Sequence, residues 1–281
     1  MAGRSSIDVF PRREPVSEWC SYDGIAGRYD SVWGSRFEAA ARFVRRRLPS
    51  TRRARVLDIG TGTGIALSAL CHQGSKTSRP VGLDRSFGMI RMARVRVPGA
   101  TFAAGDAAML PFREGVFDAA SASFVVSHLS DYRAGLLEAR RVLRPGGVFA
   151  MTSWGAEGDS YGDAWRELLA RAIAADRLQA AANRAVPNEV RFESAANVGE
   201  ALSEAGFMDV EVHSHDLHDA VSVEDFLIDR ELSSTGRFAR QALGVDGWAQ
   251  FTTHAREALG RRFGSTLERS RGILLGLARR A

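Results

Sequence analysis

One glycine-rich segment constrains this chain more than any other part of its sequence. Residues 56–64 read Val-Leu-Asp-Ile-Gly-Thr-Gly-Thr-Gly, and a helix-forming run follows at residues 65–70. Glycine has no Cβ, so the backbone of such a turn can adopt positive φ angles and approach a ligand closely. The start of the following helix offers unpaired N–H groups to an anionic group. The segment predicts a strand–turn–helix unit that binds a dinucleotide, a phosphate or a nucleoside, and alone it does not decide among them.

The hydrophobic pattern around this turn predicts an α/β sheet. We expect strands near residues 54–59, 80–84, 100–104, 117–123 and 147–153, and helices near 64–73, 86–95 and 131–143. The strands are short apolar runs without polar alternation, which is typical of a parallel sheet covered on both faces. Alternating strands and helices favour a doubly wound arrangement.

The pattern outside this region is less regular. We expect helical segments at 16–48, 161–182, 196–205 and 223–263, and strands at 207–215 and 271–279. The helical segment at 223–263 is expected to break at Gly244 and Gly247, because glycine weakens a helix.

Polar residues follow three of the predicted strands. Asp84 ends the second strand about 20 residues after the glycines, where a carboxylate can accept hydrogen bonds from both ribose hydroxyls. Asp106 follows the third strand and can accept from an adenine amino group, and His128 follows the fourth. The carboxyl ends of these strands line one crevice, so the sequence predicts a nucleoside site there.

With these residues in place, the chain resembles the class I S-adenosylmethionine (SAM)-dependent methyltransferases, in the small-molecule branch of the ubiquinone and menaquinone methyltransferases. The motifs that carry the resemblance are residues 22–30, 56–64, 82–84 with Met89, 105–107 with 110–112, 117–129 and 141–147. Each motif alone is loose, but together, in order and correctly spaced, they are specific.

The resemblance implies a Rossmann-like sheet of seven strands, with the last strand antiparallel and helices on both faces. It implies SAM as cofactor and S-adenosylhomocysteine as product. The implied cofactor-binding residues are Tyr22, Tyr29, Asp58, Gly60, Thr61, Gly62, Asp84, Arg85, Met89, Asp106, Ala107, Ser123 and Phe124. Asp58 and the turn would hold the methionine portion, while Ser123 and Phe124 would line the opening toward the methyl group.

Three segments are expected to cover the site. Residues 1–50 would form an N-terminal helical cap, and residues 51–281 the SAM-binding domain. Insertions near 154–195 and 223–263 would form a lid over the acceptor. Trp154, Tyr161, Trp165, Phe226 and Trp248 lie in these insertions, where they either line an apolar acceptor pocket or pack the helices.

A dinucleotide site is the competing interpretation of the turn. Its fingerprint is G-x-G-x-x-G, whereas this chain has G-x-G-x-G at Gly60, Gly62 and Gly64. The motifs around Asp106 and residues 141–147 also have no role in a dehydrogenase. The sequence therefore favours SAM over NAD.

Histidines provide the candidates for further chemistry. His128 is the candidate catalytic base for an acceptor that must lose a proton, and the alternative is a structural role. His213, His215 and His218 lie on or after the sixth strand, but no carboxylate pair can be placed beside them from sequence. We therefore expect no metal.

The composition of the chain limits the classes of molecule that we expect it to bind. The net charge is +5 and all but one of the 38 basic residues are arginines, spread among acidic residues. This pattern is typical of a GC-rich coding bias, and we expect neither nucleic acid nor a membrane as a partner. Two distant cysteines, Cys20 and Cys71, fit a reducing cytoplasm.

The sequence thus predicts a cytoplasmic monomer or homodimer that methylates a small molecule, in bacterial natural-product or antibiotic biosynthesis. Whether oxygen, nitrogen or carbon receives the methyl group stays open. The alternatives are an RNA or protein methyltransferase, and a SAM-binding cyclase or other non-methylating homologue.

Overall fold

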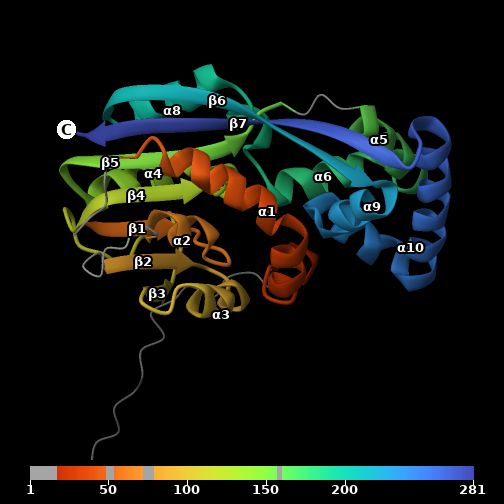
Figure 1. The fold of residues 1–281 in the computed structure, drawn as a ribbon, viewed down its shortest axis with the longest axis horizontal. Helices are drawn as coiled ribbons and strands as arrows, with labels where there is room; N and C mark the ends of the chain where they lie inside the picture. Colours follow the sequence, from red (N-terminus) through yellow and green to blue (C-terminus); the bar gives the residue numbers. More distant parts are fainter. Residues whose placement is uncertain (1–17, 49–53, 72–78, 157–159) are drawn as a thin grey trace, which may run out of the picture.

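The glycine turn lies at the centre of a single mixed sheet. The computed structural model describes residues 18–48, 54–71, 79–156 and 160–281. Within these residues the strand order is β3-β2-β1-β4-β5-β7-β6 (Figure 1). The strands are β1 (Arg55–Ile59), β2 (Arg79–Asp84), β3 (Thr101–Ala104), β4 (Phe117–Ser123), β5 (Leu143–Trp154), β6 (Phe207–Ser222) and β7 (Thr266–Arg280). Strands β1 to β5 are parallel and β7 is antiparallel to both neighbours, which confirms the predicted fold class.

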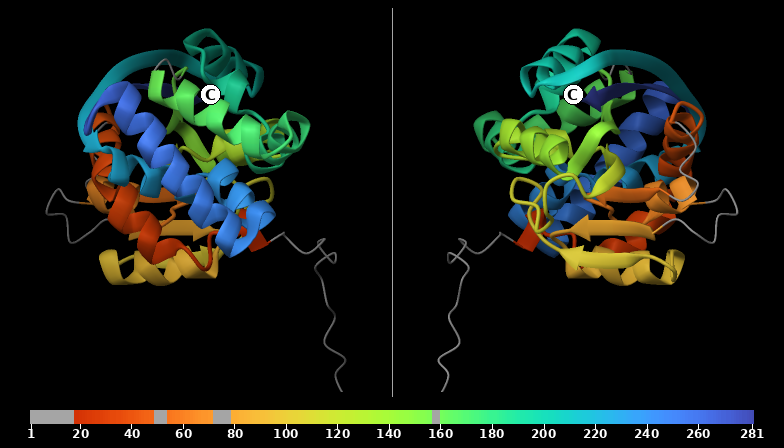
Figure 2. Two further views of the ribbon diagram at one scale, coloured as in Figure 1. Left: turned by 90° about the vertical axis from the view of Figure 1, so that its right-hand side faces the viewer. Right: turned by 90° about the vertical axis from the view of Figure 1, so that its left-hand side faces the viewer.

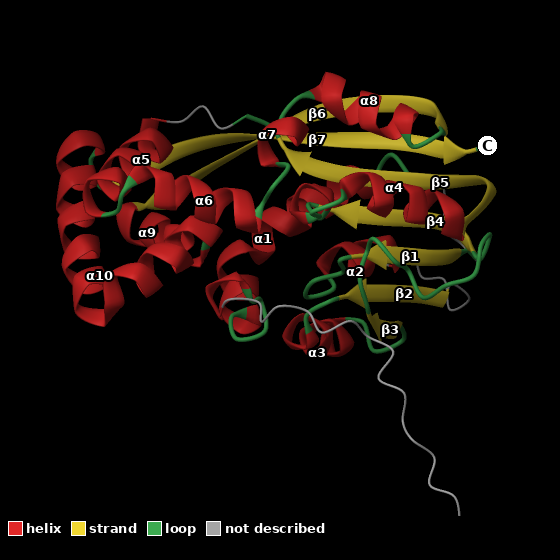
Figure 3. Cartoon of the chain, turned by 180° about the vertical axis from the view of Figure 1, so that it is seen from behind, coloured by secondary structure: helices red, strands yellow, loops and turns green. Residues whose placement is uncertain are grey.

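Helices cover both faces of the sheet. Helices α1 (Ala26–Arg45), α2 (Ile65–Cys71) and α3 (Phe87–Arg96) lie on one face. Helices α4 (Tyr132–Val142) and α8 (Ala195–Glu204) lie on the other, as the view from behind shows (Figure 3). Short helical turns complete the chain: η1 (Glu18–Cys20), η2 (Val126–His128) and α7 (Glu189–Phe192). In the described part of the chain, no helix combines the length and the apolar character that crossing a bilayer requires.

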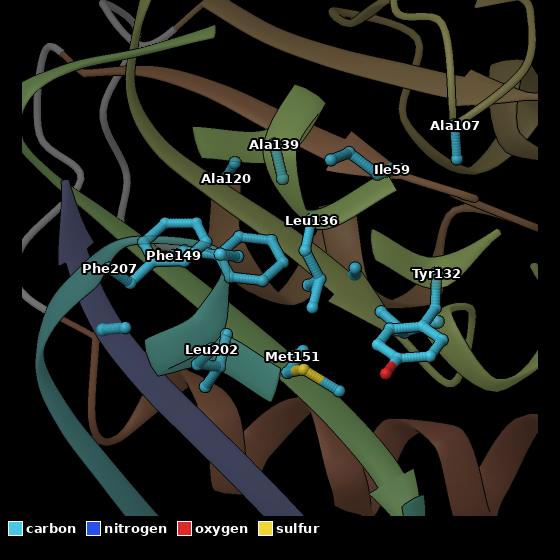
Figure 4. Close-up of a cluster of buried hydrophobic side chains, with 14 of the residues drawn as sticks. Ile59, Ala107, Ala120, Tyr132, Leu136, Ala139, Phe149, Met151, Leu202 and Phe207 are labelled. Carbon is cyan, nitrogen blue, oxygen red and sulfur yellow. The ribbon is translucent and has the colours of Figure 1, made fainter. Parts of the chain in front are cut away.

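The main hydrophobic core lies between the sheet and helices α4 and α8. Leu136 and Ala139 of α4 and Leu202 of α8 face Phe149 and Met151 of β5 (Figure 4). These side chains are at most 1% exposed. Burying such side chains stabilises the fold by roughly 1.5–3 kcal/mol each for the larger ones, which fixes the strands whose ends carry the polar residues.

Four helices form a separate layer beyond one end of the sheet, here called the helical lobe. It consists of α5 (Ser160–Ala172), α6 (Ala175–Ala185), α9 (Val223–Leu232) and α10 (Ser234–Phe263). Strands β6 and β7 run out of the sheet into this lobe, still paired with each other up to Ser222 and Thr266 (Figure 1). Viewed from that end, the blue helix α10 and the green helix α5 lie in front of the sheet (Figure 2, left).

The aromatic residues of the insertions divide between two environments. Trp165, Phe226 and Trp248 pack with Phe251 in the core of the helical lobe, so the packing interpretation is right for them. Tyr161 contacts Phe263 edge to face at a centroid distance of 4.8 Å. Trp154, at the end of β5, instead lines a cavity described below.

The two long strands were predicted too short. We expected strands at 207–215 and 271–279, but β6 continues to Ser222 and β7 starts at Thr266. Beyond the sheet, each of these strands has the other as its hydrogen-bonding partner, from His218 with Ser270 to Ser222 with Thr266. Polar side chains are tolerated there because this two-stranded extension is partly exposed, so the apolar run that marks a buried strand is missing.

Helix boundaries also differ from expectation. The predicted helix at 161–182 is two helices, α5 and α6, separated at Ile173–Ala174. Of the two glycines expected to break the later helical segment, Gly244 does so with a φ of +71°, whereas Gly247 lies within helical backbone. Before α1, residues 21–25 form bends and turns in place of helix, and residues 16 and 17 lie outside the described residues.

Candidate functional site

The glycine turn joins β1 to α2 and combines tight packing with open space. At Gly60 the φ is +64°, and an added Cβ would lie 2.3 Å from Cγ2 of Val125. At Gly62 the φ is +53°, and an added Cβ would meet no atom within 4 Å. Gly60 therefore lets the turn pack against the segment after β4, while Gly62 leaves its outer side open to a ligand.

Asp84 connects this turn to the end of β2. Its Oδ2 accepts a hydrogen bond from the N–H of Gly62 at 2.8 Å, and its Oδ1 accepts from the N–H of Ser86 at 2.9 Å. Burial raises the pKa of this carboxyl, and the two backbone donors oppose that shift. The Ser86 hydroxyl in turn caps α3 by accepting from the N–H of Met89.

A cavity of about 300 Å³ opens over the carboxyl ends of β1, β2, β3 and β4. This volume falls within the range of small-molecule sites. The predicted residues that line it are Tyr22, Tyr29, Gly60, Gly62, Asp84, Arg85, Met89, Asp106, Ala107, Ser123, Phe124 and His128. The structure therefore brings together side chains that are spread over more than a hundred residues of sequence.

Asp106 and Ala107 form the part of the wall that follows β3. Asp106 Oδ1 accepts from the N–H of Ala108 at 3.0 Å, and its backbone pairs with Met109 in an isolated bridge. These contacts hold the loop in a tight turn at the sheet edge, with Ala107 buried. Met89 and Arg85 approach from the side of α3, Met89 buried and Arg85 exposed.

Two predicted cofactor-binding residues lie behind this wall. Asp58 is 1% exposed and accepts a hydrogen bond from the Ser121 hydroxyl of β4 at 2.6 Å. Burial raises its pKa to about 6, although the hydrogen bond from Ser121 acts in the opposite direction. Thr61 is also buried and lines a smaller hollow of about 60 Å³ beside the turn.

Tyr22 and Tyr29 cover the cavity from the N-terminal segment. Their rings meet edge to face at a centroid distance of 5.8 Å. Burial raises the pKa of both phenols, most strongly that of Tyr29, so both are neutral at physiological pH. Tyr22 also meets the His128 ring, 6.3 Å away between centroids.

His128 lies in η2, directly after β4. Its Nδ1 is 3.1 Å from the carbonyl oxygen of Ala185. A carbonyl can only accept, so Nδ1 carries the proton and the neutral ring presents an unprotonated Nε2. Burial lowers the pKa of this imidazole to about 4, so the ring is neutral at physiological pH.

Phe124 stands at the boundary of this cavity in a rare backbone conformation. Its φ is +57°, which is uncommon for a residue with a side chain. Its N–H donates to the carbonyl oxygen of Thr152 on β5 at 3.0 Å, and its ring stacks on Trp154 with a centroid distance of 4.2 Å. Such local strain concentrates at functional sites.

A second cavity, of about 320 Å³, adjoins the first. The two share Tyr22, Tyr29, Phe124 and His128 as a common wall. The second cavity lies between α1, the ends of β5, β6 and β7, and the helical lobe. Its other aromatic lining residues are Trp33, Phe37, Trp154 and Phe192.

A partly buried ion-pair network forms one side of the second cavity, and sequence reasoning missed it. Arg269 of β7 donates to Asp229 of α9 at 2.9 Å and to Asp219 of β6, where its Nε is also 2.9 Å away. Arg36 of α1 binds both carboxylates, and Trp33 Nε1 donates to Asp229. Helix α1 and strand β7 meet the consecutive elements β6 and α9 here, and nothing in the local sequence marks these residues as partners.

The three histidines of β6 do not come together. His213 contacts Glu211 at 3.2 Å, His215 stacks on Phe43 at 5.0 Å, and His218 lines the second cavity. Among the described residues, no group of three His, Cys, Asp or Glu side chains is placed to hold a metal ion.

Comparison with known proteins assigns the chain to a family. Residues 57–151 match a family model described as a methyltransferase domain. Demethylmenaquinone methyltransferase of Mycolicibacterium vanbaalenii is 34% identical over 171 residues, which cover 58% of this chain and 72% of that protein. The chain belongs to the class I SAM-dependent methyltransferases. The predicted resemblance is thereby confirmed.

Solved structures share the fold of this methyltransferase. The [4+2]-cyclase SpnF is similar with a TM-score of 0.58 and 20% identity, over 92% of this chain and 94% of that chain. Phosphoethanolamine N-methyltransferase 2 of Haemonchus contortus, in complex with S-adenosyl-L-methionine, has a TM-score of 0.57 and 18% identity. That match covers 92% of this chain and 57% of the other.

The cofactor of this methyltransferase is SAM. The residues of the first cavity fit such a group. Asp84 presents a carboxylate of the kind that binds vicinal hydroxyls, and Gly62 leaves open the space that a Cβ would fill.

Proposed function

We propose that this methyltransferase binds SAM in the first cavity and transfers its methyl group to a small organic acceptor in the second. The observation that carries the proposal is the common wall of Tyr22, Tyr29, Phe124 and His128. Methyl transfer needs donor and acceptor atoms in line and close together. Two adjoining cavities that meet at the same four residues provide that arrangement.

In this assignment the residues of the first cavity hold the cofactor. Asp84 binds the ribose, with Arg85 and Met89 beside the adenosine, and Asp106 and Ala107 bind the adenine. Tyr22, Tyr29, Ser123, Phe124 and the turn at Gly60 and Gly62 surround the methionine portion. Asp58 and Thr61, which lie behind the wall, support the turn from the inside. When bound, SAM supplies an electrophilic methyl group on a sulfonium sulfur.

His128 is assigned as the proton acceptor for acceptors that must lose a proton. Its unprotonated Nε2 is available because Nδ1–H is held by Ala185. Its ring borders both cavities, as a base at the site of transfer must.

The helical lobe is assigned as the acceptor lid. It closes the second cavity through Arg230 and Ser233 and excludes water from the reacting groups. Residues 1–50 are assigned as the N-terminal cap, which covers the cofactor cavity through Tyr22 and Tyr29. The second cavity is lined by carboxylates as well as arginines, and the arginines of the chain are spread among acidic residues, which supports a small molecule over RNA as acceptor. The arginine-rich, lysine-poor sequence supports a high-GC bacterial source, and on that ground a cytoplasmic role in natural-product tailoring is part of the proposal.

The test uses methyl-labelled SAM with a panel of small phenols, amines and carbon acids, followed by mass spectrometry. Ser127→Phe, which fills the second cavity, is expected to abolish labelling while leaving S-adenosylhomocysteine binding intact. Ser203→Phe, on the exposed side of α8, is the matched control and is expected to retain labelling. Label recovered in an RNA or protein fraction, or labelling unaffected by Ser127→Phe, would overturn the proposal.

A further inference from the structure

The described residues include two buried arginines with very different surroundings. Arg269 is 7% exposed and pairs with the carboxylates of Asp219 and Asp229. Arg237, on α10, is 9% exposed, yet no carboxylate of the described residues lies within 4 Å of its guanidinium. A buried charge without a counter-charge is unfavourable, because it loses the solvation of water without compensation.

The contacts of Arg237 supply no counter-charge to its guanidinium. Its Nη1 donates to the carbonyl oxygen of Ser21 at 2.7 Å, and its Cζ lies 4.5 Å from the centroid of the Tyr22 ring. Its Nε has no hydrogen-bond partner among the described residues. A carbonyl and an aromatic face stabilise a cation only in part.

Arg237 lines the first cavity, although it comes from the helical lobe. The other two arginines of that lining, Arg85 and Arg184, are exposed and therefore solvated by water. A ligand that brings an anionic group into this cavity would supply the missing counter-charge to Arg237. The planar guanidinium matches a carboxylate, which can accept from two N–H groups at once.

We propose that Arg237 is a carboxylate-binding residue of the first cavity. The inference rests on the proposed assignment of that cavity to the cofactor. The carboxylate has two sources to be distinguished: the amino-acid group of the cofactor, or an acidic group on the acceptor. In either case the bound ligand ties α10 to the cofactor cavity, so the helical lobe docks most firmly on the loaded enzyme.

The first arm of the test compares two ligands by titration calorimetry. S-adenosylhomocysteine carries the amino-acid carboxylate, whereas 5′-methylthioadenosine has the same adenosine and thioether without it. If the cofactor is the source, Arg237→Gln weakens S-adenosylhomocysteine binding by about tenfold or more and leaves 5′-methylthioadenosine binding unchanged. Arg237→Lys, which keeps the charge, loses less affinity for S-adenosylhomocysteine.

Arg240→Gln is the matched control. Arg240 lies on the same helix, is exposed and pairs with Glu231, so its replacement is expected to leave both affinities unchanged. Normal binding of 5′-methylthioadenosine shows at the same time that a variant is folded.

The second arm titrates benzoate into proteins saturated with S-adenosylhomocysteine. Benzoate binding that is present in the wild type and lost in Arg237→Gln assigns the carboxylate to the acceptor. If neither S-adenosylhomocysteine nor benzoate binding depends on Arg237, the inference is wrong. Equal losses for S-adenosylhomocysteine and 5′-methylthioadenosine also overturn it, because Arg237 would then act only by holding Tyr22. A wild-type protein that binds neither nucleoside would instead refute the proposed cofactor site.

Discussion

The N–H of Gly62 donates a hydrogen bond to the carboxylate of Asp84 across 2.8 Å. This contact joins the turn after β1 to the end of β2, so the two parts of the proposed cofactor site hold each other in place. Asp84 also lines the first cavity, so one side chain both shapes the turn and forms part of the cavity wall.

Replacing Asp84 tests its double role. Asp84→Asn removes the charge but keeps the shape, and we expect it to weaken S-adenosylhomocysteine binding by about 1–3 kcal/mol. Titration calorimetry measures the change. Asp163→Asn, which removes an exposed carboxylate that pairs with Arg166 on α5, serves as the control. Equal affinities of Asp84→Asn and wild type would contradict the ribose assignment.

The pKa of His128 predicts an unusual pH dependence of activity. Because burial lowers this pKa to about 4, the neutral imidazole is fully present from about pH 5 upward. We expect kcat/KM to show no decline from His128 between pH 7 and pH 5, in contrast to a base of pKa near 6.5.

The same residue is tested by substitution. His128→Gln is expected to lower kcat by about 10²–10⁴-fold with an acceptor that must lose a proton, and to change S-adenosylhomocysteine affinity far less. Unaltered kcat would show that His128 is structural.

The raised pKa of Asp58 predicts that the folded protein loses stability as the pH rises. Its folded-state pKa of about 6 lies above the value near 3.9 of an unfolded chain. Its contribution is therefore fully present below about pH 4 and is lost as pH rises through about 6, by about 3 kcal/mol. In urea unfolding from pH 4 to 7.5, Asp58→Asn is expected to gain stability relative to wild type by that amount as pH increases. A difference between the two proteins that stays constant with pH would count against the prediction.

The ion-pair network of Arg269 predicts that two arginine substitutions lower the free energy of unfolding by different amounts. Arg269→Met leaves the buried Asp229 without one of its partners and is expected to lower the free energy of unfolding by about 3–5 kcal/mol. Arg256→Gln breaks an exposed pair with Glu224 and is expected to cost less than about 1 kcal/mol. Urea denaturation compares the two, and similar losses would show that the network is weakly coupled to folding.

The turn and the strand ends around the first cavity could be predicted from the sequence because their signals are local. The turn at Gly60 and Gly62 needs residues without a Cβ, and Asp84 and Asp106 follow apolar strands directly. A parallel sheet then brings their strand ends to one edge without further information.

The contacts around the second cavity could not be predicted because the residues that make them are distant in sequence. Arg36 and Arg269 are far apart in the chain, yet they bind the same two carboxylates. Arg237 reaches the first cavity from the end of the chain opposite to Tyr22. In the sequence these arginines resemble the many that are solvated, and only tertiary packing distinguishes them.

The extension of β6 and β7 beyond the sheet determines where residues 223–263 join the rest of the fold. Residues 223–263 leave and rejoin the sheet at the paired ends Ser222 and Thr266, so a change of length within this segment does not alter the register of the two strands. The segment also supplies Arg237 to the first cavity and Asp229 to the ion-pair network. Chimeras joined at Ser222 and Thr266 that keep these two residues would therefore test whether the segment decides which acceptor is methylated.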